Sequence, residues 1–284
     1  MRLFYIVMIS YAFLGCDSFK EEVDAIPNRV GELVLIQGFL SPEVSIIRVR
    51  VSKAVSYFEQ PILLDDLQED IRELLTIREA TVTIIDEDQN EIDLEYSEDS
   101  FAYEVLATEY PIVPGKKYRL IVKTEEKEFL AECTIPMKII EDIIVDTTVL
   151  NSDFFTGSLN FEFEDIIGEP NFYIVGAKYL RLSDNRSFNS DFREERFISD
   201  VNEDGVSLFA KGSISGLDGP IEVIAQVANT DENIYKLLRA VFVNNSDQDE
   251  NPFFEPIIPP NNIEGEGGYG VFGGFRLYEK QVEF

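Results

Sequence analysis

Apolar and polar residues alternate with a period of two along most of the chain from residue 33 onward. Residues 33–40 form the apolar run LVLIQGFL, and in 46–53 every second residue is apolar while two arginines occupy the opposite face. Successive side chains of a β-strand point to opposite faces, so this alternation is typical of half-buried strands. The pattern predicts a chain built mainly of β-strands.

Local signals divide these strands into a predicted β-sandwich over residues 32–136. Two alternating stretches flank the polar sequence DEDQN, which predicts a hairpin with its turn at residues 86–90. The dipeptide Pro114-Gly115 predicts a type II turn. Only 63–77 departs from the strand period, because its apolar residues recur at helical spacing and predict a short helix. Strands about 8–12 residues apart, separated by turns, are typical of a sandwich.

After Pro136 a second β-rich half is expected over residues 137–284, with one or two short helices in the whole chain. Residues 181–207 are polar and predict a long exposed excursion. The sequence DENIYKLLRAVFVNN at 231–245 is the best helix candidate, with Thr230 as its N-cap. Its apolar residues Ile234, Leu237 and Leu238 would face the sheet.

The composition of the chain limits the classes of function that it can have. There are 24 Lys and Arg against 54 Asp and Glu, a net charge of −30, which disfavours nucleic-acid binding and attraction to an anionic membrane. The chain has no His, which excludes Ser-His-Asp and Cys-His catalysis and His-ligated zinc. We therefore expect a protein that is not an enzyme, with no cofactor and no metal. A carboxylate-based hydrolase stays open as a minor alternative, since the chain is rich in paired carboxylates.

Calcium is the one metal worth weighing, because it takes oxygen ligands. The densest oxygen clusters are DEDQNE at 86–91 and SDQDEN at 246–251, and neither fits an EF-hand loop. The first lies at a predicted hairpin tip, where a solvated turn is the favoured interpretation.

The N-terminus predicts a lipid anchor. Arg2 precedes the apolar stretch Leu3 to Leu14, which is too short to span a bilayer and fits a signal-peptide core. Gly15 and Cys16 follow, and the order apolar run, small residue and Cys resembles a lipoprotein signal-peptidase site. We expect a signal peptide over 1–15 and a lipid on Cys16. An ordinary signal peptide or a short anchor is the alternative.

Residues 16–31 predict an acidic tether. Within it, Lys20, Glu21 and Glu22 resemble the surface-export signal of Bacteroidota lipoproteins, although a plain solvated tether also fits this composition. The other cysteine, Cys133, lies in an alternating run and is expected to be a buried strand residue.

The most distinctive sequence is NPFFEPIIPPNNIEGEGGYGVFGGF at residues 251–275. It resembles the closing motif of the domain-of-unknown-function family 4249, a group of Bacteroidota envelope lipoproteins. The run LVLIQGFL, then ATVTIIDED, then VPGKKYRLIVKT follow in the same order, so the resemblance spans about residues 30–280. The helical insert near Leu67 departs from the family pattern, as do Glu264 and Glu266.

The resemblance implies an Ig-like N-terminal sandwich and an outer-membrane lipoprotein, lipid-anchored and exposed at the cell surface. It also implies a role as an accessory or binding subunit of a TonB-dependent outer-membrane barrel. The alternative is a stand-alone structural or adhesive envelope lipoprotein. Within the motif, two interpretations stay open: a packed strand that closes the second half, or a partner-contact surface made by Asn262, Gly265, Gly267, Gly268, Tyr269 and Phe272.

Overall fold

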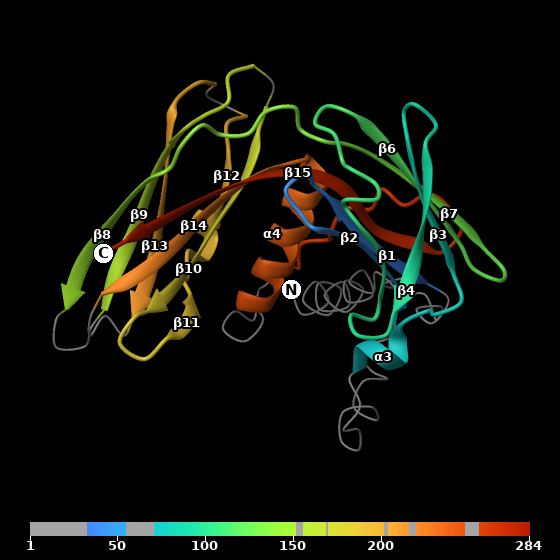
Figure 1. Cartoon of the computed structure of the whole chain (residues 1–284), viewed down its shortest axis with the longest axis horizontal. Coiled ribbons are helices and arrows are strands. Elements are labelled where there is room, and N and C mark those ends of the chain that lie inside the picture. Colours follow the sequence, from blue (N-terminus) through green and yellow to red (C-terminus); the bar gives the residue numbers. More distant parts are fainter. Residues whose placement is uncertain are drawn as a thin grey trace, which may run out of the picture.

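The computed structural model describes residues 33–54, 71–151, 156–168, 170–201, 204–215, 220–247 and 256–284. Within these ranges the strands form one sheet of twelve strands and one of three (Figure 1). Two α-helices accompany them in the described chain, α3 (Ile71–Leu75) and α4 (Glu232–Asp247). Neither of these helices combines the length and hydropathy needed to cross a bilayer. The predicted fold class, mainly β with a sandwich architecture, is confirmed.

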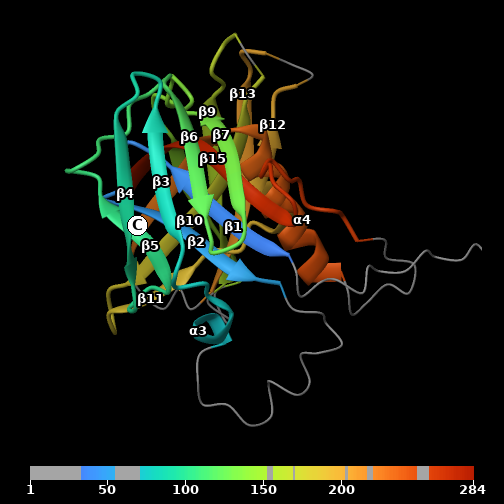
Figure 2. The same ribbon diagram turned by 90° about the vertical axis from the view of Figure 1, so that its right-hand side faces the viewer.

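The first half of the chain forms one sandwich, whose strands pair in the order β1-β2-β5-β4-β3-β6-β7. Their inward side chains share a single core, in which Ile36, Val49, Val82 and Leu120 are at most 1% exposed. Each such side chain stabilises the fold by about 1.5–3 kcal/mol through its burial. Figure 2 shows β3, β6 and β7 side by side at the front of this sandwich. The strands are β1 (Val34–Leu40), β2 (Ile46–Lys53), β3 (Thr81–Asp86), β4 (Glu91–Ser97), β5 (Ala102–Leu106), β6 (Lys117–Lys123) and β7 (Glu128–Thr134).

The second half forms another sandwich. The three-stranded sheet β13-β9-β8 packs against the arm β11-β10-β14 of the large sheet, and a second core lies between them. Phe161 from the small sheet and Tyr173 and Val227 from the large one are all at most 1% exposed. The elements are β8 (Ile144–Asn151), β9 (Thr156–Glu164), β10 (Phe172–Arg181), β11 (Arg186–Asn189), η2 (Arg193–Arg196), β12 (Phe197–Ser199), β13 (Ser207–Ser215) and β14 (Ile221–Thr230).

The last strand, β15 (Gly268–Glu283), belongs to both sandwiches. Residues 268–274 pair in parallel with β1, and residues 275–283 pair antiparallel with β14. Figure 1 shows β15 running through the upper middle of the molecule from one half to the other. Sixteen strand residues extend over roughly 50 Å, enough to reach through two small domains. The closing motif was expected to belong to a second domain over 137–284, but its strand also pairs with β1 of the first half.

Several local predictions are confirmed. β3 and β4 form the expected hairpin, with Val82 paired to Leu94. Gly115 has φ +77°, and the amide of Lys116 donates to the Val113 carbonyl, which closes the predicted turn. Cys133 is 7% exposed on β7, and burial raises the pKa of its thiol well above the usual range.

The N-cap of α4 is Asp231, and the prediction of Thr230 was wrong. The Asp231 Oδ1 atom accepts a hydrogen bond from the amide of Ile234 at 2.9 Å. The Thr230 hydroxyl donates to the Phe172 carbonyl at 3.1 Å, because Thr230 is still part of β14. Ile234 is buried against the sheet as expected, whereas Leu237 and Leu238 are only half-buried.

The predicted excursion at 181–207 is exposed along most of its described residues, but it is not a plain loop. The segment carries β11, η2 and β12, and Phe192 within it is 1% exposed. The Phe192 ring packs beside Phe161, with centroids 5.1 Å apart, and lies over Gly212. Pairing of β11 and β12 with β10, together with the buried ring of Phe192, therefore gives structure to a segment whose polar composition had suggested a loop.

Candidate functional site

The closing motif, described over residues 256–275, seals the first sandwich. Glu264 forms an isolated antiparallel bridge with Leu130 of β7, with N···O distances of 2.7 and 2.9 Å. Four residues later the chain enters β15 beside β1. The motif therefore covers the free edges of both β7 and β1, the two strands at the ends of the first sandwich.

Two asparagines hold this segment in place. The Asn262 Oδ1 atom accepts from the amide of Phe272 at 2.9 Å, and its Nδ2 donates to the carbonyls of Phe272 at 2.7 Å and Glu132 at 3.3 Å. The Asn261 Oδ1 atom accepts from the amides of Ile263 and Gly270 at 3.1 and 3.0 Å. Asn262 thus acts as a staple between the motif, β15 and β7.

The three predicted glycines form the turn that leads into β15. Gly265 has φ +127°, and a Cβ at this position would lie 2.6 Å from the Glu128 carbonyl oxygen. Gly267 also has positive φ, and Gly268 lies against the ring of Phe129. These positions allow the turn to pass close to β7, which is a structural role.

The two aromatic residues of the predicted contact surface differ in exposure. Phe272 is 0% exposed and belongs to the first core, so its assignment as a partner contact is corrected. Tyr269 is half-buried, and its hydroxyl donates to the Pro259 carbonyl at 2.6 Å. The ring of Phe272 packs in the first core because residues 268–274 of β15 pair with β1 and form part of that sandwich.

Asn262→Ala is expected to lower the free energy of unfolding by about 2–4 kcal/mol, since three hydrogen bonds are lost and backbone groups of Phe272 and Glu132 lose their partner. Urea denaturation measures the change. Asn160→Ala is the matched control, because the half-buried Asn160 side chain on β9 donates one hydrogen bond, to the Thr148 hydroxyl at 3.2 Å. Equal stability of the two variants would contradict the staple role of Asn262.

Two cationic side chains of β15, Arg276 and Lys280, hold the linker between the halves, which is the segment between β7 and β8, against this strand. The Arg276 guanidinium donates from Nε to Glu43 at 2.7 Å and from Nη1 to the Met137 carbonyl at 2.9 Å. Further along, Lys280 Nζ donates to Asp142 at 2.8 Å and to the Ile143 carbonyl at 2.7 Å. The Lys280 hydrogen bond lowers the pKa of Asp142 below its ordinary value. These contacts join the β1–β2 turn, the linker and the shared strand into one joint.

A cleft of about 560 Å³ opens beside this joint. Residues 134–138 of the linker, the loop after β9 and residues 229–232 before α4 line it. Met137 and Ile167 are 67% and 68% exposed at the cleft, and Lys138 Nζ reaches across it to the Ile167 carbonyl at 3.0 Å. Its volume falls in the range of ligand sites, which often lie between domains. The cleft is therefore suited to binding a small ligand or a peptide side chain.

Three carboxylates gather close to the cleft, although they are far apart in the sequence. Oxygen atoms of Asp165, Asp200 and Asp204 lie within 4.8 Å of one another. Such oxygens are the ligands that Ca²⁺ prefers. The buried pair is already hydrogen-bonded, because Tyr173 donates to Asp165 at 2.7 Å and the Asn171 amide donates to Asp200 at 2.6 Å. The cluster thus joins the loop after β9 to the loop after β12, and no sequence motif predicted it.

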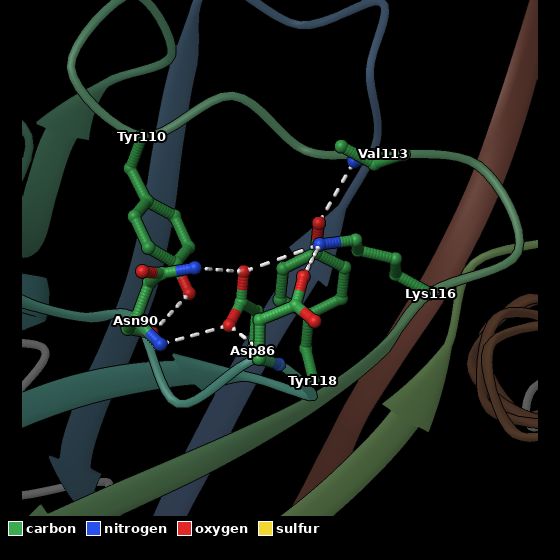
Figure 3. Close-up of polar contacts among 7 residues, drawn as sticks. Asp86, Asn90, Tyr110, Val113, Lys116 and Tyr118 are labelled. Atoms are coloured by element: carbon green, nitrogen blue, oxygen red, sulfur yellow. Dashed lines mark hydrogen bonds and ion pairs between the residues drawn. The ribbon is translucent and has the colours of Figure 1, made fainter.

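The predicted hairpin turn at 86–90 is held by its own side chains (Figure 3). The Asp86 carboxylate accepts from the backbone and side-chain nitrogens of Asn90, both at 2.9 Å, and pairs with Lys116 at 3.5 Å. The Asn90 side-chain bond is the main cause of the lowered pKa of Asp86. The Tyr110 hydroxyl donates to the Asn90 carbonyl at 2.9 Å, and the Tyr118 hydroxyl accepts from the Val113 amide. This network fits the interpretation of residues 86–91 as a turn.

The remaining predicted positions lie outside the described residues. They are the signal peptide at 1–15, Cys16, Lys20, Glu21 and Glu22, residues 63–70 of the predicted short helix with Leu67, and most of the oxygen cluster at 246–251. The lipid anchor and the export signal therefore stay predictions from the sequence.

Comparisons with known proteins identify one family and several distant solved structures, two of which are described below. The family model described as "Domain of unknown function (DUF4249)" matches residues 19–281. No curated protein matches the chain. The crystal structure of bovine butyrophilin is 12% identical, with a TM-score of 0.21 over 68% of this chain and 90% of that one. The chicken interferon gamma receptor alpha chain is 6% identical, with a TM-score of 0.20 over 68% and 87%.

Neither structural likeness carries a functional inference at these TM-scores. The family match shows the family and not a function, and it covers almost the whole described fold, from before β1 into β15, including the closing motif. The chain belongs to the family described as a domain of unknown function, DUF4249.

Proposed function

We propose that this protein is a surface-exposed outer-membrane lipoprotein that acts as an accessory, non-catalytic subunit of a TonB-dependent transporter. The single observation that carries the proposal is the sequence order of an apolar run, Gly15 and Cys16 ahead of a folded body. Two or more acyl chains on one cysteine give stable membrane attachment, so a body with a net charge of −30 needs no basic surface to remain at the membrane.

The folded body supports a binding role. Two sandwiches share β15 and are stapled at their junction, which holds the surrounding loops at fixed positions. The cleft of about 560 Å³ lies at that junction and is open to solvent through Met137 and Ile167. An accessory subunit of a transporter needs such a rigid body, with a concave site that could hold a substrate or part of the partner. The transporter itself is inferred from the resemblance to envelope lipoproteins.

Lipidation of Cys16 makes a clear prediction for thiol chemistry. Native full-length protein is expected to expose no reactive thiol, because Cys16 is acylated and Cys133 is buried with a raised pKa. After unfolding in urea, a maleimide should label one thiol per chain, at Cys133. Mass spectrometry of the N-terminal peptide checks the acyl group directly. A second reactive thiol at Cys16 in protein from the native membrane would contradict lipidation.

The transporter partnership is tested separately. Tagged protein solubilised from its own outer membrane should retain a large β-barrel protein through affinity purification. The same tagged chain with Cys16→Ala is the control, since it should leave the membrane fraction and lose the barrel. Recovery of the lipidated protein alone, combined with unchanged nutrient uptake after deletion, would favour a stand-alone structural or adhesive role instead.

Surface exposure has its own test. Protease added to intact cells should cleave the wild-type protein, and substitution of Lys20, Glu21 and Glu22 by alanine should protect it. Complete protection of the wild type would contradict the export signal.

A further inference from the structure

Five strands form the edges of the two sheets in the described chain, and four of them are covered or short. β12, which pairs with β10 alone, has three residues. β7 is bridged by Glu264 of the closing motif. β13 is covered by Asp191, which exchanges backbone hydrogen bonds with Ser213 at 2.7 and 3.2 Å, and by Glu195. β11 has only four residues and carries the exposed Arg186. Proteins protect sheet edges from pairing with other chains by covering them, by keeping them short or by placing cations on them.

β8 is the exception. It is eight residues long, Ile144–Asn151, and among the described residues it pairs only with β9. Its sequence IVDTTVLN contains no Lys, Arg or Pro, and its one irregularity is a register shift near its end, between Val149 and Asn151. In an antiparallel edge strand every second residue directs its N–H and C=O away from the sheet. Among the described residues no second strand pairs with the outer edge of β8, although the Asp146 Oδ1 atom accepts a hydrogen bond from the Thr147 amide at 2.8 Å.

The side chains along β8 indicate what kind of strand could pair with it. Ile144 is 59% exposed and Asp146 is exposed on the same face, where Glu162 of β9 lies beside Ile144 in the register. In an added strand, an apolar side chain would lie beside Ile144 and a basic side chain beside Asp146, because opposite charges stabilise cross-strand pairs. A second copy of this chain is a poor occupant, since each copy carries a net charge of −30.

We propose that β8 is a docking edge for an extended, lysine- or arginine-containing segment of a partner protein, which binds by adding a strand to the sheet β13-β9-β8. Backbone hydrogen bonds supply the affinity in this mode of recognition, and alternate side chains supply the specificity. The inference stands on β8 alone and needs neither the lipid anchor nor the transporter. Figure 1 shows β8 at the outer margin of the second half, away from the junction with the first.

The test uses detergent-solubilised full-length protein and a fluorescent ten-residue peptide that alternates lysine with valine and threonine. Fluorescence anisotropy should show binding, and hydrogen exchange should show new protection confined to residues 144–151. Ile144→Lys should weaken binding about fivefold to tenfold, because it places a cation on the edge where the peptide carries its own. Phe209→Lys is the matched control: Phe209 is 65% exposed on the other side of Glu162, on the covered strand β13, and its substitution should leave binding unchanged.

Several results would overturn the proposal. They are the absence of peptide binding, equal binding of a peptide with glutamate in place of lysine, and protection elsewhere than β8. An equal loss of affinity in Phe209→Lys would assign the binding to the sheet face instead of the edge. A concentration-dependent dimer that Ile144→Lys dissociates would show that a second copy occupies β8. Thermal unfolding of both variants checks that they fold, as their exposed positions lead us to expect.

Discussion

Gly270→Ala is expected to abolish folding of the whole chain. Gly270 has φ +139°, which residues with a side chain rarely adopt, and a Cβ there would lie 1.9 Å from the Ile36 carbonyl oxygen and 2.8 Å from its carbonyl carbon. Both obstacles are backbone atoms of β1 that cannot rotate away. The strain and the displaced strand together are expected to cost more than about 5 kcal/mol, which is comparable to the entire stability of a typical domain.

Gly176→Ala on β10 is the control for this substitution. Its nearest neighbour is the end of a flexible side chain, Gln226 Oε1, at 3.9 Å. Alanine should therefore be tolerated there and raise the stability slightly, by about 0.5 kcal/mol, since it restricts the unfolded chain. Circular dichroism and soluble yield measure both variants. A cooperative melt of Gly270→Ala close to that of wild type would contradict the close parallel pairing of β15 with β1.

Ending the chain after residue 267 is expected to unfold both halves, although the deleted residues lie at one end of the sequence. The deletion removes β15 from between β14 and β1, and with it the buried side chains of Val271 and Phe272, both 0% exposed. It also removes Arg276 and Lys280, which hold the linker. The twelve-stranded sheet would then split into two arms, each with a newly exposed edge.

Limited proteolysis followed by mass spectrometry checks this deletion. Trypsin should degrade residues 33–136 and residues 137–247 of the truncated chain at similar rates, whereas both resist in the full chain. A matched truncation that removes only Phe284 is the control, because this residue lies beyond the end of β15 and its loss removes only the two backbone hydrogen bonds that it exchanges with Ile221. Survival of either half in the chain that ends at residue 267 would show that this half folds without the shared strand.

The alternation of apolar and polar residues was sufficient to predict the strands of the first sandwich, because one face of each strand is buried in a single core. The hairpin at 86–90 and the turn at Gly115 followed from local chemistry, which needs no tertiary information. Cys133 was correctly expected inside for the same reason. Features that depend on the residues of one strand or one turn were therefore predictable.

Features that depend on long-range contacts were not. The polar segment around Phe192 contains one buried ring. Its packing against Phe161, which is distant in the sequence, could not be predicted from local residues. Asp231 replaced Thr230 as the helix cap because β14 continues through Thr230, a boundary set by pairing with β10. The cluster of Asp165 and Asp200 arises only when two distant loops meet.

The closing motif shows the same limit. Its glycines and aromatic residues predicted either a packed strand or a contact surface, and the structure assigns Phe272 and Asn262 to internal packing. The family resemblance was carried partly by this motif, and in this structure the motif is a joint between strands of the first sandwich. Partner contacts are better sought at the cleft beside Met137 and along β8.

The central claim is that β15 makes the two sandwiches one folding unit, and native-state hydrogen exchange under increasing urea tests it most directly. Amides of β6 in the first half and of β10 in the second should show opening free energies that converge on one value and reach it at the same urea concentration. If the amides of one half stay protected at urea concentrations where those of the other exchange freely, the two sandwiches unfold independently and the claim is contradicted.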